Sequence, residues 1–369
     1  MHIPPWPQAS EREAELLRMV LDSPQWGGFH PFVAEWEETF AAFQHSAYGI
    51  SAFNGTVTLE IALSALGIGP GDEVIVPAVS FVSSATSISR AGAVPVFVDI
   101  DPCTLNIDPE AIKRVITSST KAIMAVHFGG NMCDMAALHA ICREYNLYLI
   151  EDAAHAHGSE WEGKRAGSFG ITGSFSFQNG KVLSAGEGGM LVTSDESFAA
   201  QARSLANCGR LPGRSFYEHY NLGTNLRLTA FQAAVLIAQF ERLPQQIRTR
   251  SGNAALLKAS LGDLREISWQ SAHPQTTANS VYLLIGRVTG GAPVRSRVCQ
   301  ALAAKNIPCT PFYPWPLYRN EVFRNVPCRV APCPVAEAAV EDAFWLPHRV
   351  LLAEPEVVEI AANAIRAAI

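Results

Sequence analysis

Three side chains in the middle of the chain have types and a spacing that suit a cofactor site. An apolar run at residues 147–150 predicts a buried strand, and Asp152 follows it, at the place where α/β sheets put their ligand chemistry. A second predicted strand, residues 173–177, carries Ser176, and Lys181 comes five positions later, before a glycine-rich turn. Pyridoxal phosphate needs these groups: a lysine for a Schiff base, a carboxylate against its pyridinium nitrogen, and donors for its phosphate.

Lys181 is the best placed of the six lysines in the chain. It alone lies between a predicted strand end and a glycine-rich turn on the same side as Asp152, whereas Lys164 lies in a segment that has the character of an exposed turn. Asp152 must remain ionised, because a protonated pyridine nitrogen lets the ring accept electrons when Lys181, acting as a base, moves a proton from carbon.

Upstream segments could complete such a site. Asn54-Gly55-Thr56 links a predicted strand to a predicted helix at residues 57–66, and free N–H groups at a helix start bind phosphate. The alternative is an ordinary turn with a capping threonine. Phe81 follows another predicted strand, where its ring could stack on a flat cofactor or pack in the core.

Strands and helices alternate over the first two thirds of the chain. The strands are apolar throughout, which predicts a largely parallel sheet with helices on both faces, an α/β fold. Further strands are expected at 48–53, 74–76, 94–98, 122–126 and 190–193, and helices at 10–21, 32–43, 82–90, from about 108, from about 135 and at 195–207.

The pattern changes near residue 244. We expect one helix to run through Phe240 and to end before Leu243-Pro244. Beyond it the pattern predicts a smaller α+β domain, so the chain of 369 residues divides into a large domain, 1–244, and a small domain, 245–369. The small domain should hold a long helix, short strands such as 281–288, a helix at 294–304, a loop at 309–323, and a final helix, loop and helix from 334.

Composition excludes several classes of function. A net charge of -6 without a run of Lys or Arg indicates neither nucleic acid nor an anionic membrane as a partner. The eight cysteines include no C-x-x-C pair and no metal-type spacing, so reduced thiols and no metal site are expected. The start of the chain lacks a signal-peptide pattern and no run of eighteen apolar residues occurs, which predicts a cytoplasmic protein.

Taken in order, the motifs resemble the sugar aminotransferase family named after DegT, DnrJ and StrS. That family belongs to the fold-type-I, aspartate-aminotransferase-like enzymes, so the resemblance implies a mostly parallel seven-stranded sheet with helices on both faces and a smaller C-terminal α+β domain. The motifs are NGT at 54–56, GIGPGDEVIVPAVSF at 67–81, VHFGG with DM at 126–135, EDAAHAHG at 151–158, FSFQNGK with GEGG at 175–189, and GTNLRL at 223–228.

The resemblance also implies a role for each site residue. Lys181 would form the Schiff base to pyridoxal 5'-phosphate and Asp152 would pair with the pyridinium nitrogen. Asn225 would reach the phosphate from a neighbouring subunit, which implies an isologous homodimer with a shared site. The remaining cofactor contacts would be the backbone of Gly55, Thr56 and Val57, the hydroxyl of Ser176, the stacking ring of Phe81, and His155 near the ring 3-oxygen, where many members have glutamine.

The implied activity is transfer of an amino group from glutamate or glutamine to a keto group of a sugar nucleotide or cyclitol. Such a reaction serves the biosynthesis of amino sugars, polysaccharides or antibiotics. The segments FSFQNGK, AHAHG and PHRVLLA also resemble members that act on cyclitols or that make 3-amino-5-hydroxybenzoate, so a dehydratase or aromatising synthase is the alternative. Lys181 argues against the branch that replaces this lysine with histidine. The intact cofactor set argues against a purely regulatory or structural protein.

Contacts to the acceptor are harder to predict, because loops vary without disturbing a fold. The candidates lie in aromatic or cationic segments suited to a sugar ring, a diphosphate or a carboxylate. Each has an alternative as a packing, capping or surface residue. The candidates are Trp26, Arg227, Tyr313, His348 and Arg349.

Overall fold

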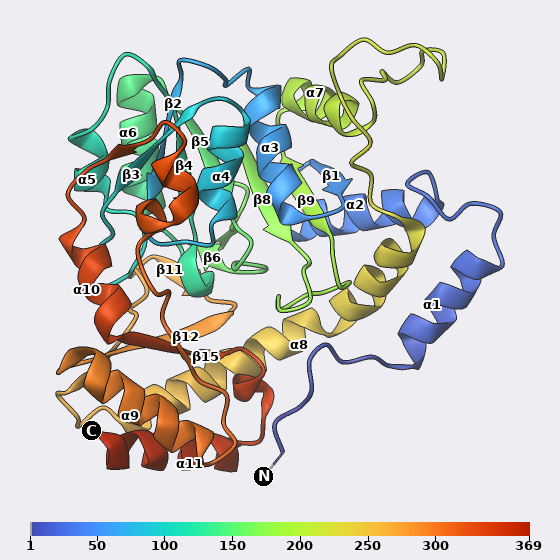
Figure 1. Ribbon diagram of the computed structural model, residues 1–369. Helices are drawn as coiled ribbons and strands as arrows, with labels where there is room; N and C mark the ends of the chain where they lie inside the picture. The colour runs from blue at the N-terminus through green and yellow to red at the C-terminus, as the bar shows by residue number, and fades with distance from the viewer. Residues whose placement is uncertain (1) are drawn as a thin grey trace.

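The computed structural model describes residues 2–369 and contains three sheets surrounded by helices (Figure 1). The large sheet fills the upper part of the view, and the smaller antiparallel sheet lies below it, next to α9 and α11. The long helix α8 runs obliquely through both parts. Among the described residues, no helix has the length and apolar character needed to cross a membrane.

The large sheet has eight strands in the order β1-β9-β8-β5-β4-β2-β3-β14. Neighbours from β14 to β8 pair in parallel, whereas β9 pairs antiparallel with both β8 and β1. The predicted mostly parallel sheet is confirmed, but the strand number is corrected from seven to eight, because β14 adds from the C-terminal part of the chain. The strands are β1 (Tyr48–Ala52), β2 (Glu73–Pro77), β3 (Val94–Val98), β4 (Thr120–Val126), β5 (Tyr148–Asp152), β8 (Thr172–Ser176), β9 (Gly189–Thr193) and β14 (Arg329–Val330).

Helices cover both faces of this sheet because its strands are apolar on both sides. One buried cluster joins α2, α5, α6 and the first part of α8 to the sheet, and a second joins α3, α4 and α7 to it. The helices of this part are α1 (Glu11–Leu21), α2 (Pro31–Phe43), α3 (Gly55–Ala65), α4 (Ser83–Arg90), α5 (Pro109–Lys113), α6 (Met135–Tyr145), α7 (Glu196–Ala206) and α8 (Ala230–Ser260).

Helix α8 is continuous through Pro244, so the prediction that a helix ends before Leu243 was wrong. A proline inside a helix removes a hydrogen bond and costs about 3 kcal/mol. Side chains that are buried on both sides of it, including Leu236, Leu243 and Leu257, offset this cost through packing. The expected domain boundary after residue 244 therefore falls inside a helix.

The C-terminal part has its own buried cluster, built around a four-stranded antiparallel sheet in the order β10-β12-β15-β13. From residue 334 the sequence predicted only a helix, a loop and a helix. The structure adds a strand there, β15 (Ala343–Pro347), which pairs with β12 (Leu283–Val288). This strand is five residues long, too short for an unambiguous signal. The other elements are β10 (Ile267–Trp269), β13 (Thr310–Pro311), α9 (Gly291–Ala303), α10 (Pro334–Asp342) and α11 (Pro355–Ala368), and a third sheet joins β11 (Thr276–Ala278), β6 (Glu160–Trp161) and β7 (Lys164–Arg165).

Candidate active site

A cavity of about 640 Å³ lies at the carboxyl ends of the parallel strands. Strands β4, β5 and β8 reach it through Val126, Asp152 and Ser176, their last residues. Ligands of α/β proteins bind at this edge of the sheet. The C-terminal part contributes the opposite wall, so the cavity lies between the two sheets. Its wall comprises Asn54, Gly55, Thr56, Leu59, Ser80, Phe81, Ser83, Val126, Asp152, Ala154, His155, Ser176, Gln178, Gly180, Lys181, Glu187, Tyr282, Leu283, Tyr313, Trp345 and Pro347.

Asp152 is the last residue of β5, and both of its carboxylate oxygens accept hydrogen bonds. Ser84 Oγ donates to Oδ2 at 2.6 Å, and the N–H of Ala154 lies 3.3 Å from Oδ1. Ser80 Oγ lies 2.7 Å from Ser84 Oγ and extends the network. Sequence reasoning missed Ser84, although its position four residues after Ser80 at the start of α4 was a usable signal.

Lys181 lies in the same wall and has a perturbed amine. Burial lowers the pKa of Lys181 to about 8, against the opposing effect of the Asp152 charge. An appreciable fraction of the amine is therefore neutral near neutral pH, as a base or nucleophile requires.

The start of α3 provides an anion cradle. The backbone N–H groups of Gly55 and Thr56 have no hydrogen-bond acceptor within residues 2–369. A Cβ placed on Gly55 would lie 2.7 Å from Ser176 Cβ, so only glycine lets the helix start so close to that hydroxyl. Val57 differs from the expectation, because its N–H donates to Asn54 Oδ1 at 3.0 Å and caps the helix instead.

His155 and Phe81 lie on the walls of the cavity. The N–H of Gly129 donates to His155 Nδ1 at 3.3 Å, so the ring proton is on Nε2. Burial lowers the pKa of His155 well below its usual range, so the imidazole is neutral. Phe81 is 56% exposed, which disfavours the alternative that it packs in the core.

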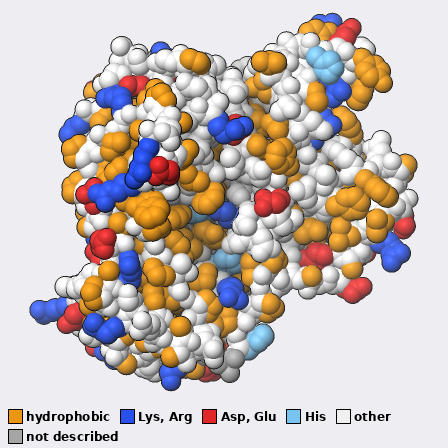
Figure 2. Space-filling model, in the orientation of Figure 1, with side chains coloured by type: hydrophobic (Ala, Val, Ile, Leu, Met, Phe, Trp, Pro, Cys, Tyr) orange, Lys and Arg blue, Asp and Glu red, His pale blue; other side chains and the backbone are white. Residues whose placement is uncertain are grey.

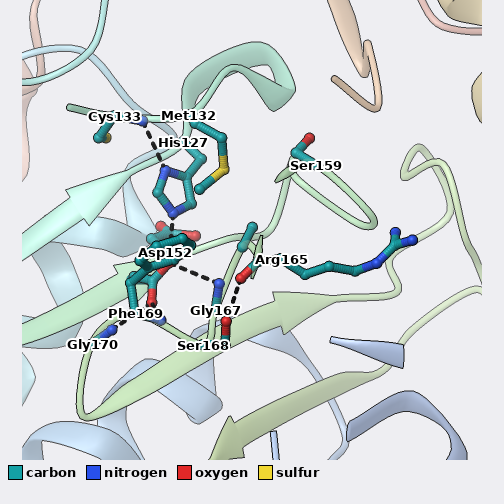
Figure 3. Close-up of polar contacts among 12 residues, drawn as sticks. His127, Met132, Cys133, Asp152, Ser159, Arg165, Gly167, Ser168, Phe169 and Gly170 are labelled. Carbon is teal, nitrogen blue, oxygen red and sulfur yellow. Dashed lines mark hydrogen bonds and ion pairs between the residues drawn. The ribbon is translucent and has the colours of Figure 1, made fainter. Parts of the chain in front are cut away.

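Glu151, the neighbour of Asp152, has a structural position. It is fully buried, accepts from His127 Nε2 at 2.9 Å, and accepts three backbone N–H bonds from the turn at residues 167–170. Burial alone would raise its pKa, but these hydrogen bonds lower it. Figure 3 shows His127 between the backbone of Cys133 and the strand that ends in Asp152. Glu151 thus anchors the end of β5 from which Asp152 reaches the cavity.

Four of the five predicted acceptor residues do not line this cavity; Tyr313 does. Arg227 lines a separate cavity of about 370 Å³ and donates to Asn207 Oδ1 at 2.8 Å. Trp26 is half exposed and packs against Phe231. His348 is only 2% exposed, so it is not a surface cap, and its Nε2 lies 3.2 Å from the carbonyl oxygen of Gly180. Its neighbour Arg349 is half-buried.

Asn225 also lies away from the cavity of its own chain. It is exposed, and its backbone pairs with Asn207 beside the protruding loop that follows α7. That loop projects at the upper right of Figure 1, and hydrophobic side chains appear on this projection in Figure 2. Exposed apolar surface of this kind marks an interaction site. The exposed residues of the loop include Phe216, Tyr217, Tyr220 and Leu222.

Sequence reasoning missed the contribution of the C-terminal part to the wall. Tyr282 precedes β12, and its ring centroid lies 4.7 Å from Lys181 Nζ. Trp345 and Pro347 come from β15, the strand that was not predicted. A sequence separation of about 100 residues leaves no local signal for such contacts.

The residues present fit pyridoxal phosphate. A lysine of lowered pKa and a carboxylate face one cavity, and two N–H groups without acceptors lie beside the Ser176 hydroxyl at a helix start. Lys181 would hold the aldehyde carbon, Asp152 the pyridinium nitrogen, and Gly55, Thr56 and Ser176 the phosphate. Within the described residues, no group of three or more His, Cys, Asp or Glu side chains could hold a metal ion.

Comparisons with known proteins agree with this geometry. The DegT/DnrJ/EryC1/StrS aminotransferase family matches residues 7–365, which confirms the resemblance of the motifs. The chain is 40% identical to a 3-amino-5-hydroxybenzoate synthase of Amycolatopsis mediterranei (98% of this chain, 97% of the relative). It is 38% identical to a putative L-glutamine:3-amino-2,3-dideoxy-scyllo-inosose aminotransferase of Micromonospora echinospora (98% and 92%). The crystal structure of a 3-amino-5-hydroxybenzoic acid synthase superposes with a TM-score of 0.95 at 38% identity (100% of this chain, 98% of that one), which confirms the predicted fold class.

Proposed function

This chain belongs to the DegT/DnrJ/EryC1/StrS aminotransferase family, and on that premise we propose that it transfers an amino group from glutamate or glutamine to the keto group of a cyclitol or sugar. Members of the family bind pyridoxal phosphate, as the sequence predicted. The observation that carries the proposal is the convergence of Lys181, Asp152 and the free N–H groups of α3 on one cavity.

Bound pyridoxal phosphate supplies an aldehyde that takes up the amino group and a ring that accepts the electron pair released at carbon. The residues of the chain bind the cofactor and move the protons. Gly55, Thr56 and Ser176 bind the phosphate and so fix the orientation of the ring. Lys181, whose amine is partly neutral, removes the proton from the carbon that bears the amino group and returns it to the carbon on the other side of the nitrogen. Asp152, anchored by Ser84, keeps a proton on the ring nitrogen.

The cavity wall favours a cyclitol over a sugar nucleotide. Recognition of a diphosphate usually uses arginine or lysine, and Lys181 is the only such residue among those that line the cavity. Aromatic rings from Phe81, Tyr282, Tyr313 and Trp345 instead offer flat surfaces to a six-membered ring. The relative from Micromonospora echinospora, named for a scyllo-inosose derivative, has an acceptor of this class.

We further propose that the enzyme is a homodimer in which Asn225 of each chain completes the phosphate site of the other. The exposed apolar loop next to Asn225 supports this arrangement, since it lies outside the core of its own chain. The site of one chain would then be incomplete alone.

An aromatising synthase is the second candidate, because the relative from Amycolatopsis mediterranei and the superposed crystal structure carry that name. Both reactions use the same lysine and acid. They differ in the products, since a synthase releases water from the ring and needs no amino donor, so the amino form of the cofactor does not accumulate.

The decisive experiment supplies L-glutamine or L-glutamate to purified holoenzyme and follows the cofactor. We expect absorbance near the visible edge that disappears as the amino form of the cofactor accumulates, and its return when 3-amino-2,3-dideoxy-scyllo-inosose or a related keto-cyclitol is added. Lys181→Ala should show neither change. An enzyme whose cofactor remains unchanged with both donors, yet which releases water from a cyclic keto acid, is the synthase instead.

A further inference from the structure

Tyr282 is a cavity residue that the proposed reaction has not used. It comes from the C-terminal part of the chain, yet its ring centroid lies 4.7 Å from Lys181 Nζ. A Cβ placed on Gly180 would lie 3.8 Å from the Tyr282 hydroxyl, so this hydroxyl is adjacent to the residue that precedes the lysine. A phenol and an amine therefore share one small volume of the site.

The ring of Tyr282 packs against two histidine rings. The His155 ring lies 4.4 Å away at an angle of 36°, and the His348 ring lies 5.9 Å away at 26°. The carbonyl oxygen of Tyr282 also accepts from the N–H of His348 at 3.0 Å. Both histidines are buried, so this stack fixes the position of the hydroxyl relative to Lys181.

The hydroxyl of Tyr282 is available to contact a substrate. It makes no hydrogen bond with any described side chain or backbone group, while the cavity that it lines is open to a substrate. Burial raises the pKa of Tyr282 to about 12, so the phenol keeps its proton at neutral pH. Its neighbour Lys181 is the group that accepts protons, which leaves Tyr282 as a donor.

We propose that Tyr282 is a further catalytic residue, the general acid that protonates the oxygen atom leaving the keto acceptor as water. This inference rests on the proposed function. When an amine adds to the ketone, one amine proton passes to the carbonyl oxygen, which becomes a hydroxyl group. The C–O bond of this hydroxyl then breaks with the electron pair on oxygen, and the Tyr282 proton joins that oxygen to release water. The nitrogen gives its second proton to Lys181, and the Lys181 ammonium then returns a proton to the phenolate, so both groups end as they began.

Tyr148 provides a control outside the site. It is the first residue of β5, at the opposite end of the strand from Asp152, is 47% exposed, and does not belong to the cavity wall. Removal of its hydroxyl therefore tests the loss of a phenol from the protein without loss of one beside the lysine.

The test is a single-turnover reaction of holoenzyme loaded with pyridoxamine phosphate, the amino form of the cofactor, with 2-oxoglutarate or 2-oxoglutaramate as the ketone. Tyr282→Phe keeps the ring and the stack and removes only the acid. We expect its rate at saturating ketone to fall about 100-fold, the usual contribution of a general acid. The half-saturating ketone concentration, the cofactor dissociation constant and the thermal midpoint should remain close to those of the wild type, and Tyr148→Phe should stay within about threefold in rate.

Other outcomes overturn the inference in distinguishable ways. A Tyr282→Phe rate within about threefold of the wild type, or an equal loss in Tyr148→Phe, removes Tyr282 as the acid but leaves the proposed function intact. A Tyr282→Phe protein with weakened cofactor binding or a lower thermal midpoint assigns the residue a structural role. Wild-type enzyme that reacts with neither ketone, nor with glutamate or glutamine in the other direction, refutes the proposed function and this inference together.

Discussion

The floor of the cavity and the loop after α7 are built in opposite ways. Asp152 and Ser176 lie at the ends of buried strands and are 7% and 8% exposed, whereas Tyr217 and Leu222 in the loop are 84% and 102% exposed. Every carboxylate oxygen at the end of β5 has a partner within the chain. The loop projects from the body of the molecule (Figure 1) and carries exposed hydrophobic side chains (Figure 2).

This difference indicates which parts of the active site a single chain can build alone. A floor of paired strands is rigid, so it can place the acid Asp152 and the start of the segment that carries Lys181, between β8 and β9, with the accuracy that catalysis needs. An exposed aromatic loop has the character of an interface, and the neighbouring Asn225 can serve a phosphate only through another chain. We expect changes in the floor to abolish chemistry and changes beside the loop to weaken cofactor binding.

The largest effect should follow from Lys181→Ala. Loss of the base and of the covalent attachment should reduce kcat by about 10⁴-fold or more, measured as amino transfer from glutamine or glutamate. Lys164→Ala, which changes an exposed lysine of strand β7, is the control and should retain wild-type activity. Comparable activity in both variants would show that the floor does not carry the chemistry.

Asp152→Asn should come next, with a loss of kcat of about 10²–10³-fold, because an amide cannot hold a proton on the ring nitrogen. Ser84→Ala removes one hydrogen bond to this carboxylate and should cost about 10-fold, since such bonds to charged groups contribute about 1.5–3 kcal/mol. The two variants should differ in kcat while their thermal midpoints remain similar. Equal losses would mean that Ser84, not the charge of Asp152, is the important group.

The buried amine of Lys181 should also affect stability. Its pKa is about 8 in the folded chain against 10.5 when exposed, so the unfolded state binds more protons between these values. This cost to stability is fully present below pH 8 and disappears as the pH rises to 10.5. In urea unfolding of cofactor-free protein, Lys181→Met should be more stable than the wild type by on the order of 2–3 kcal/mol at pH 7 and by less than about 1 kcal/mol at pH 10. If the difference in the free energy of unfolding between Lys181→Met and the wild type does not change with pH, Lys181 does not have a lowered pKa in the folded chain.

The smallest effect should come from the loop side of the comparison. Asn225→Ala should weaken cofactor binding about 10-fold, as expected for the loss of one hydrogen bond to a charged group, without loss of Lys181 chemistry. Mixed dimers of Asn225→Ala and Lys181→Ala chains would contain one intact site. At a cofactor concentration too low to fill the Asn225→Ala sites, these intact sites should give a randomly mixed population about a quarter of wild-type activity. If each variant forms dimers by itself but refolded mixtures of the two recover no activity, Asn225 does not serve the partner's site.

Local pattern is a good guide where a residue follows a buried strand. Apolar runs of four or five residues mark the strands, and their order in a parallel sheet brings the ends of β5 and β8 to one edge, so the sequence alone places Asp152 and Ser176 together. The same reasoning failed at Pro244, because packing on both sides of α8 outweighs the local cost of the proline. The Val57 N–H donates to the capping side chain of Asn54, a contact that the phosphate motif by itself does not predict.

By itself the sequence determined the α/β class, the family, and the lysine and acid that face the cavity, because these depend on short-range periodicity and on residues next to strand ends. Only the tertiary structure decided that Ser84 holds Asp152, that Tyr282 lies over Lys181, and that His348 is buried behind it rather than exposed at the surface. These contacts join segments that are separated by about 70 to 170 residues. The Ser84 contact depends on how α4 packs on the large sheet, and the other two depend on how the C-terminal part packs across the cavity; no local pattern in the chain encodes that packing.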